Sequence, residues 1–330
     1  MNWALRHLSL ILFATTIPAA AQAQAIRSCG ADSDIKSDCS PCRFSPGRNQ
    51  PDLFVRFVTR KTTATEILQR IEVAREPTGP ALQVLAPSGN DVDMCAVVVG
   101  DISFDGFADL GVTSAAGMVN SRHDYFLYRP GGLFEAVGNF PTLHVDAGRK
   151  LLTSFVRGGY AGGAFERTTY AVFGNRIAKS LEEIQDIDPE RQYFVRKVTD
   201  YTQGAPKLVA TIKVLAPRMS GTAIWLADLK ARHARALVQF RTRSAAAALL
   251  ELEPAFADTD VAYLYEDDAA KQIVPALNDL GLFYEQVSNY ERAVAVLKEV
   301  TAAAPTRAGA WLVLGDALYG QARTKNEAAA

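Results

Sequence analysis

The sequence predicts an α+β protein in two domains, an antiparallel all-β domain followed by an all-α domain of helical hairpins. Upstream of about residue 180, short apolar segments are separated by Gly, Pro and Asn, which favours strands. Downstream, Ala, Leu, Glu, Lys and Arg dominate, which favours helices. Near the C-terminus, Leu280-Gly281 recurs as Leu314-Gly315 at a spacing of 34 residues, which indicates stacked helical units. We therefore expect a β domain over 26–180 and a helical domain over 181–330.

The first 25 residues have the pattern of a secretory signal peptide. They contain a basic start at Arg6, an apolar run over 8–17, and small-x-small cleavage sites that end at Ala23 and Ala25. The apolar run is shorter than the roughly 20 residues that span a bilayer. We expect a mature protein that is periplasmic or secreted, without stable membrane insertion.

Composition excludes few functions but argues against a nucleic-acid partner. The 330 residues are 48% hydrophobic and 22% charged, and the formal net charge is −1. A chain with so little net charge has no strong electrostatic attraction to nucleic acid or to an anionic membrane.

The four cysteines favour two disulfides, because an even number in an exported chain usually pairs. They are Cys29, Cys39, Cys42 and Cys95, and sequence leaves all three pairings open. The Cys39-Ser-Pro-Cys42 spacing also fits a redox-active pair, although its polar flanks do not resemble the strand and helix around such a motif.

The β domain is expected to contain short strands joined by tight turns, as in a sandwich, a barrel or a propeller-like sheet. Pro130, Gly131 and Gly132 mark a hairpin turn between two of these strands. The segment 63–74 fits either a short helix or a longer strand. The expected strands are 53–58, 81–85, 95–99, 109–113, 125–128, 133–137, 151–156 and 168–173.

The helical domain is clearest from about residue 222 and includes a run of strong helix formers over 245–252. The preceding region, 185–220, is ambiguous, because its short apolar runs at 193–198 and 208–215 fit strands or helices equally.

The C-terminal segment 273–322 resembles the tetratricopeptide repeat, through Leu280-Gly281, Tyr284, Ala293 and Pro305. Small residues at Gly281 and Ala293 allow two helices to pack closely. The segment holds about one and a half units, fewer than the three or so that a free-standing array needs. The resemblance implies a protein or peptide partner in a groove, or a helical unit that packs on the β domain.

The loop 101–110 has the ligand pattern of a calcium site, with glycine at its sixth position. Calcium takes six to eight oxygens at about 2.3–2.6 Å. With three carboxylates and no Glu at Val112, where an EF-hand has one, we expect weak binding, on the order of 10⁻⁴–10⁻³ M. The alternative is an Asp/Gly turn that binds no ion. The candidate ligands are Asp101, Ser103, Asp105, the Phe107 carbonyl and Asp109.

Around this loop the chain resembles two kinds of protein. The loop after a β-rich run is similar to the calcium loops of FG-GAP repeats. Its order of acidic loop, aromatic strand 125–128, turn, strand 133–137 and Gly-rich loop 158–163 resembles exported bacterial β proteins related to the periplasmic lysozyme inhibitors. That resemblance implies lysozyme inhibition as one function, with the loops 118–124 and 158–163 as candidate contacts.

An enzyme is the other class that the sequence raises. His123 and His144 lie near Ser121 and Asp124, but neighbours on a strand point to opposite faces. The hydrolase, zinc-protease and phosphate-loop motifs are absent from the sequence. We expect an exported, non-catalytic, protein-binding protein with a structural calcium loop. The alternatives are a periplasmic lysozyme inhibitor and a periplasmic hydrolase of unknown substrate.

Overall fold

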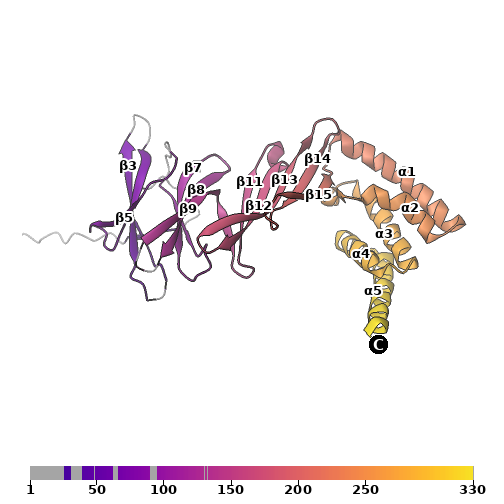
Figure 1. Cartoon of the computed structure of the whole chain (residues 1–330). Helices are drawn as coiled ribbons and strands as arrows, with labels where there is room; N and C mark the ends of the chain where they lie inside the picture. The colour runs from indigo at the N-terminus through magenta and orange to yellow at the C-terminus, as the bar shows by residue number, and fades with distance from the viewer. Residues whose placement is uncertain are drawn as a thin grey trace, which may run out of the picture.

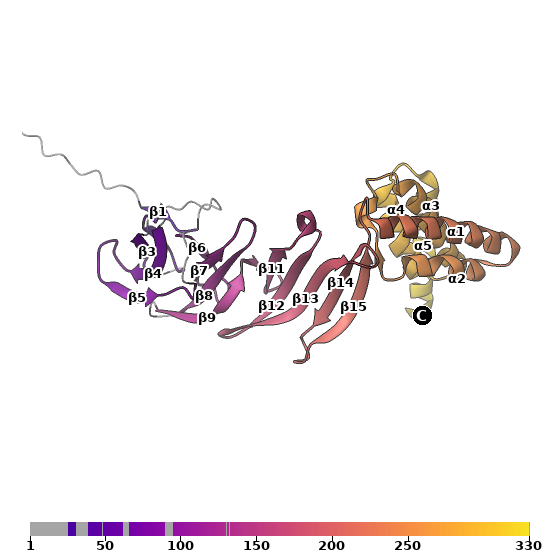
Figure 2. The ribbon, with the colours of Figure 1, turned by 90° about the horizontal axis from the view of Figure 1, so that it is seen from above.

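The computed structural model describes residues 26–30, 39–47, 49–61, 66–89, 95–129, 131 and 133–329. The expected signal peptide lies outside these residues. The molecule is elongated, with strands at one end and helices at the other (Figures 1 and 2). This arrangement confirms the predicted fold class, in which an antiparallel-rich β region precedes a block of helices.

In the described chain, the strands form three sheets with the orders β1-β2-β3-β4-β5, β6-β7-β8-β9 and β10 through β16. Their pairings are antiparallel except for β1 with β2 and β15 with β16. The segment that fitted a helix or a strand, 63–74, is a strand over its described part. The strands are β1 (Arg27–Ser28), β2 (Cys42–Phe44), β3 (Leu53–Lys61), β4 (Glu66–Ala74), β5 (Ala81–Leu85), β6 (Val97–Gly100), β7 (Asp109–Ala116), β8 (Ser121–Arg129), β9 (Leu133–Pro141), β10 (Leu143–Asp146), β11 (Leu151–Arg157), β12 (Phe165–Phe173), β13 (Arg176–Asp188), β14 (Tyr193–Asp200), β15 (Lys207–Val214) and β16 (Thr259–Asp260).

Strand β8 explains how the three sheets stack. Its residues alternate between two faces, and both faces are covered, so its central part is buried without a break. Phe126 and Tyr128 join a core with the first sheet, whereas Tyr125 and Leu127 join a second core with the third sheet. The second sheet is therefore the middle layer of the β region.

Two disulfides fix the N-terminal edge of this region. They join Cys29 to Cys42 and Cys39 to Cys95, which resolves the three possible pairings. Because Cys39 and Cys42 each bond to a different cysteine, they do not form the redox-active pair that their spacing allowed. Both bonds border the core shared by the first two sheets.

The third sheet continues past the expected domain boundary. Residue 180 falls inside β13, and the ambiguous region 185–220 forms β14 and β15, so the helices begin only at Ser220. The physical reason is that this half of the sheet is a single layer. Most residues of β14 and β15 are half-exposed or exposed on both faces, and no apolar alternation marks them as strands in the sequence.

The helical half has one continuous core, which includes Leu215, just after β15, and against which Tyr193 of β14 packs. The helices α3 and α4 form the expected hairpin, and a Cβ on Gly281 would lie 2.6 Å from the Leu297 side chain, which shows how closely they approach. Trp225 is buried. The helices are α1 (Ser220–Thr242), α2 (Ala245–Phe256), α3 (Ala270–Gln286), α4 (Tyr290–Ala303) and α5 (Ala308–Ala329), with 3₁₀ turns at Tyr160–Gly162 and Ala262–Leu264.

Candidate functional site

The acidic loop is held together by its own carboxylates, which accept hydrogen bonds from backbone N–H groups. Asp101 accepts from the N–H groups of Asp105 and Gly106, at 3.1 and 3.0 Å. Asp105 in turn accepts from the N–H of Phe107 at 2.9 Å. Gly106 has a φ of 89°, which a residue without a side chain adopts at little cost. These bonds form the sharp turn that the sequence predicted.

Asp109 is the structural centre of the loop. Its side chain is fully buried and accepts from the N–H groups of Ile102, Ser103 and Tyr128, at 2.8, 2.9 and 2.8 Å. Burial raises the pKa of this carboxyl, and the three N–H groups oppose that shift. Asp109, the first residue of β7, therefore joins the acidic loop to strand β8.

This arrangement does not gather the predicted calcium ligands. Within the described residues, no three His, Cys, Asp or Glu side chains are grouped so that they could hold a metal ion. The donor set is rich in oxygen, and the Ser103 hydroxyl is buried without a hydrogen-bond partner. The hydrogen bonds described for Asp101, Asp105 and Asp109 all come from backbone N–H groups. Calcium binding by this loop stays a prediction of the sequence.

His123 and Asp124 lie on opposite faces of β8, as expected from strand geometry. The His123 ring contacts the hydroxyls of Thr113 and Thr142 at 3.3 and 3.1 Å, and burial lowers its pKa to about 4. Asp124 instead accepts from Ser88 and Asn139. The imidazole is therefore neutral, and its hydrogen-bond partners, which include the Ser121 hydroxyl at 3.4 Å, are hydroxyls rather than a carboxylate.

The structure brings the two candidate inhibitory loops together. The Asn120 amide group donates to the backbone carbonyl of Arg157 at 2.8 Å and accepts from its N–H at 2.9 Å. Met118 is fully exposed beside this bridge, and Tyr160 is 61% exposed. Tyr160 and Ala161 have positive φ values of 57° and 54°, which are uncommon for residues with side chains and occur at functional turns.

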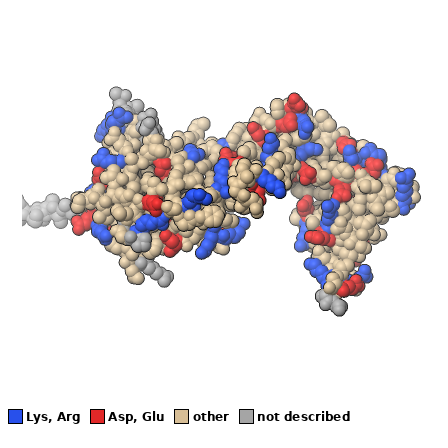
Figure 3. Space-filling view, viewed as in Figure 1, with Lys and Arg blue, Asp and Glu red and all other residues tan. Residues whose placement is uncertain are grey.

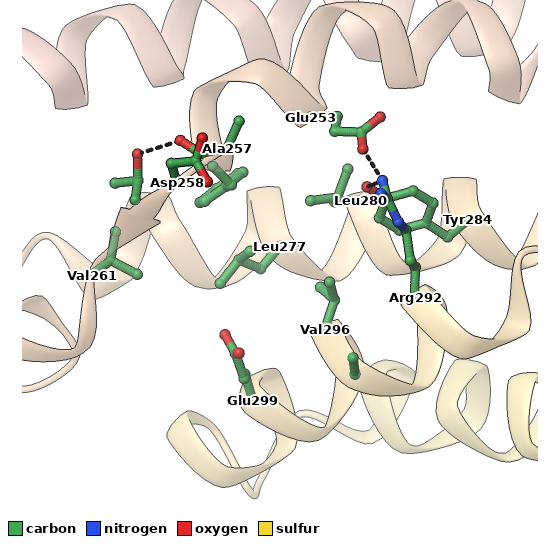
Figure 4. A pocket seen from close by; sticks show the side chains of 13 residues that line it. Glu253, Ala257, Asp258, Val261, Leu277, Leu280, Tyr284, Arg292, Val296 and Glu299 are labelled. Carbon is green, nitrogen blue, oxygen red and sulfur yellow. Dashed lines mark hydrogen bonds and ion pairs between the residues drawn. The ribbon is translucent and has the colours of Figure 1, made fainter. Parts of the chain in front are cut away.

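A second candidate site, which the sequence did not identify, is a pocket of about 440 Å³ between α2, α3 and α4. Figure 4 shows its apolar floor and its charged ends. The pocket is lined by Glu253, Phe256, Ala257, Asp258, Thr259, Val261, Leu277, Leu280, Tyr284, Arg292, Ala295, Val296 and Glu299.

The two ends of the helical pocket differ in charge. At one end, Arg292 pairs with Glu253 and donates to the Tyr284 hydroxyl at 3.3 Å. At the other end, Asp258 and Glu299 have no cation partner among the described ion pairs. Partial burial raises the pKa of Glu299. With three carboxylates and one guanidinium on its walls, the pocket has an excess of negative charge and suits a partner with a basic group.

Comparison with known proteins does not identify a family. Neither the scan against protein-family models nor the search of curated proteins finds a match. A search of solved structures finds a chain described as a Xanthomonas type IV secretion system related protein, with a TM-score of 0.37 and 15% identity. The match covers 55% of this chain and 98% of that chain. At this level of similarity, it supports no conclusion about fold or function.

Two further observations concern the helices and the surface of the molecule. None of the described helices has the length and apolarity that crossing a membrane requires. On the face seen in Figure 3, acidic and basic residues are interspersed over both halves of the molecule. Mixed charges of this kind give no broad field of one sign.

Proposed function

We propose that the chain is an exported, non-catalytic protein that binds a protein or peptide partner through the pocket of its helical half. The observation that supports this proposal most directly is the pocket itself, which combines an apolar floor with an acidic end. Export is supported by the N-terminal signal pattern and by two disulfides, which persist in oxidising compartments. We assign the helical hairpin to the tetratricopeptide type on the strength of its repeat pattern.

The chemistry of the pocket defines the kind of partner. Leu277, Leu280 and Val261 are buried in its floor and suit an apolar side chain. Asp258 and Glu299 suit a Lys or Arg one or two residues away from that side chain. Arg292 is already paired with Glu253, so it adds orientation rather than free positive charge. We therefore expect a segment with an apolar anchor next to a basic residue.

Affinity purification from periplasmic extract tests this function, with the full mature chain as bait. Ala295 is exposed on the wall of the pocket, and Ala295→Trp would fill it. Lys298→Ala is the matched control, because Lys298 is exposed on the same helix outside the pocket. We expect the wild type and Lys298→Ala to retain the same partner, and Ala295→Trp to lose at least tenfold in affinity. A partner that Ala295→Trp retains fully would refute the pocket as the binding site.

Lysozyme inhibition is a second candidate, favoured by the bridge between Asn120 and Arg157 that joins the two exposed loops. Such an inhibitor would insert Tyr160 and Met118 into the cleft of the enzyme. The test is lysis of a bacterial cell suspension by lysozyme with the mature chain added. Inhibition that Tyr160→Ala abolishes would support this function, and an unchanged lysis rate would exclude it.

A further inference from the structure

Helix α5 has a second apolar face, which is independent of the pocket and points away from the helical core. Its large side chains are exposed: Trp311 by 51%, Leu312 by 68%, Leu318 by 42% and Tyr319 by 72%. Together with Gly315 they follow the spacing i, i+1, i+4, i+7 and i+8, which forms one stripe on a helix of 3.6 residues per turn. Trp311 aligns with the buried Leu277 at the 34-residue spacing of the repeat, yet it is half-exposed.

The opposite face of α5 explains why Trp311 is not in the core. Ala310, Leu314 and Ala317 are buried against α3 and α4, and a Cβ on Gly320 would lie 2.3 Å from the Tyr290 ring. One face of α5 is thus buried against the rest of the chain. A helix that is apolar on both faces is usually covered on both, so we expect a partner to cover the outer stripe.

The stripe is self-complementary about Gly315. A Cβ built on Gly315 would have no heavy atom within 4 Å, so a second backbone can approach there without a clash. We propose that the stripe binds a second copy of this chain, with the two α5 helices antiparallel across a two-fold axis at Gly315. In that register, Trp311 and Leu312 of one copy come level with Tyr319 and Leu318 of the other, and symmetry repeats the contact.

Two features of the stripe suit such a dimer. The Trp311 indole N–H already donates to the Pro305 carbonyl at 2.9 Å, so its polar group is satisfied and its ring is held before any partner arrives. The charged residue nearest to the centre, Asp316, lies at the border of the stripe, so the proposed contact buries no unpaired charge.

The exposed area indicates a reversible dimer rather than an obligate one. Aromatic side chains bury roughly 150–250 Å² each, and Trp311 and Tyr319 are more than half exposed. With the exposed parts of Leu312 and Leu318 added, the stripes of two copies together amount to on the order of 1,000 Å². Specific stable interfaces bury about 1,200–2,000 Å² in total, and transient ones bury less. We therefore expect an equilibrium between monomer and dimer at micromolar concentrations.

Sedimentation velocity of the full mature chain over a range of concentrations tests the dimer. The wild type should change from the monomer mass to twice that mass, and Leu312→Glu should stay monomeric at concentrations where the wild type is dimeric. Leu250→Glu is the matched control, because Leu250 is 80% exposed on α2 and lies outside the stripe. A monomeric wild type at every concentration, or a Leu312→Glu variant that still dimerises, would overturn the proposal.

A cross-link tests the register separately. Gly315→Cys should form a disulfide-linked dimer under mild oxidation, because the two-fold axis brings its two copies together. Gly309→Cys is the control, since Gly309 is equally open but lies off the stripe. Equal cross-linking at both positions would contradict the antiparallel contact at Gly315. Circular dichroism of each variant shows whether the helices are intact.

Discussion

Asp109→Ala is the substitution that most sharply tests the structure of the acidic loop. It removes the acceptor from the N–H groups of Ile102, Ser103 and Tyr128. The Ile102 N–H keeps a second acceptor, the Gly100 carbonyl at 3.0 Å. The N–H groups of Ser103 and Tyr128 therefore lose the most when the carboxylate is removed. An unsatisfied buried N–H costs about 1–3 kcal/mol. Removal of the buried carboxylate also removes its desolvation cost, which offsets part of this loss. We therefore expect the free energy of unfolding to fall by roughly 2–4 kcal/mol.

Equilibrium unfolding of the mature chain in urea measures this loss. Among the described residues, both tryptophans, Trp225 and Trp311, lie in helices, so tryptophan fluorescence follows the helical half. Near-ultraviolet circular dichroism of tyrosines also reports on the β half, which contains the buried Tyr125 and Tyr128, whereas the tryptophan signal does not. Asp109→Ala should lower the urea midpoint of the tyrosine signal and leave the tryptophan signal unchanged.

The same unfolding experiment is repeated with and without calcium. If Asp109 acts through backbone hydrogen bonds, the loss of stability is the same in chelator and in millimolar calcium. A loss seen only in calcium would show that the carboxylate acts as a metal ligand. An unchanged midpoint in both conditions would refute the role assigned to Asp109.

Three further predictions concern His123, Gly221 and calcium binding by the acidic loop. The pKa of His123 is about 4 in the folded protein against an ordinary 6.5, so the unfolded state binds the proton more tightly. Stability should fall as pH falls from about 6.5 to about 4, by roughly 3 kcal/mol, and His123→Gln should flatten that profile in urea titrations. Gly221→Ala places a Cβ 2.1 Å from the Arg191 carbonyl and should destabilise the helical half by about 1–3 kcal/mol. A Cβ at Gly309 has no heavy atom within 4 Å, so Gly309→Ala should stabilise the helical half slightly. If the loop binds calcium, millimolar calcium should raise the melting temperature of the wild type but not of Asp105→Ala; no shift in the wild type would refute ion binding.

The strands of the β region could be predicted where one or both faces are buried. The apolar run around Tyr125 and Leu127 identified β8 because its two faces contact two cores. Strands β14 and β15 could not be assigned, since their half of the third sheet is one layer thick and carries polar residues on both faces. The change from strands to helices was therefore expected near residue 180, about 40 residues before the first helix at Ser220.

The acidic loop shows which features of a motif can be predicted from sequence. Its turn at Gly106 and its oxygen donors were predicted, but the direction of each carboxylate depends on which N–H groups the fold brings near. For Asp109, one of those groups belongs to Tyr128, which is 19 residues away in sequence. The helical pocket was missed because its lining comes from three helices and a loop, and no local pattern connects Glu253 with Arg292 and Glu299.

The central claim is that the pocket between α2, α3 and α4 binds the partner. The most direct measurement is quantitative mass spectrometry of proteins retained from periplasmic extract by wild type, Ala295→Trp and Lys298→Ala. We predict one set of proteins retained by the wild type and by Lys298→Ala, and depleted at least tenfold with Ala295→Trp. Equal recovery by all three baits would contradict the claim and would direct attention to the β half.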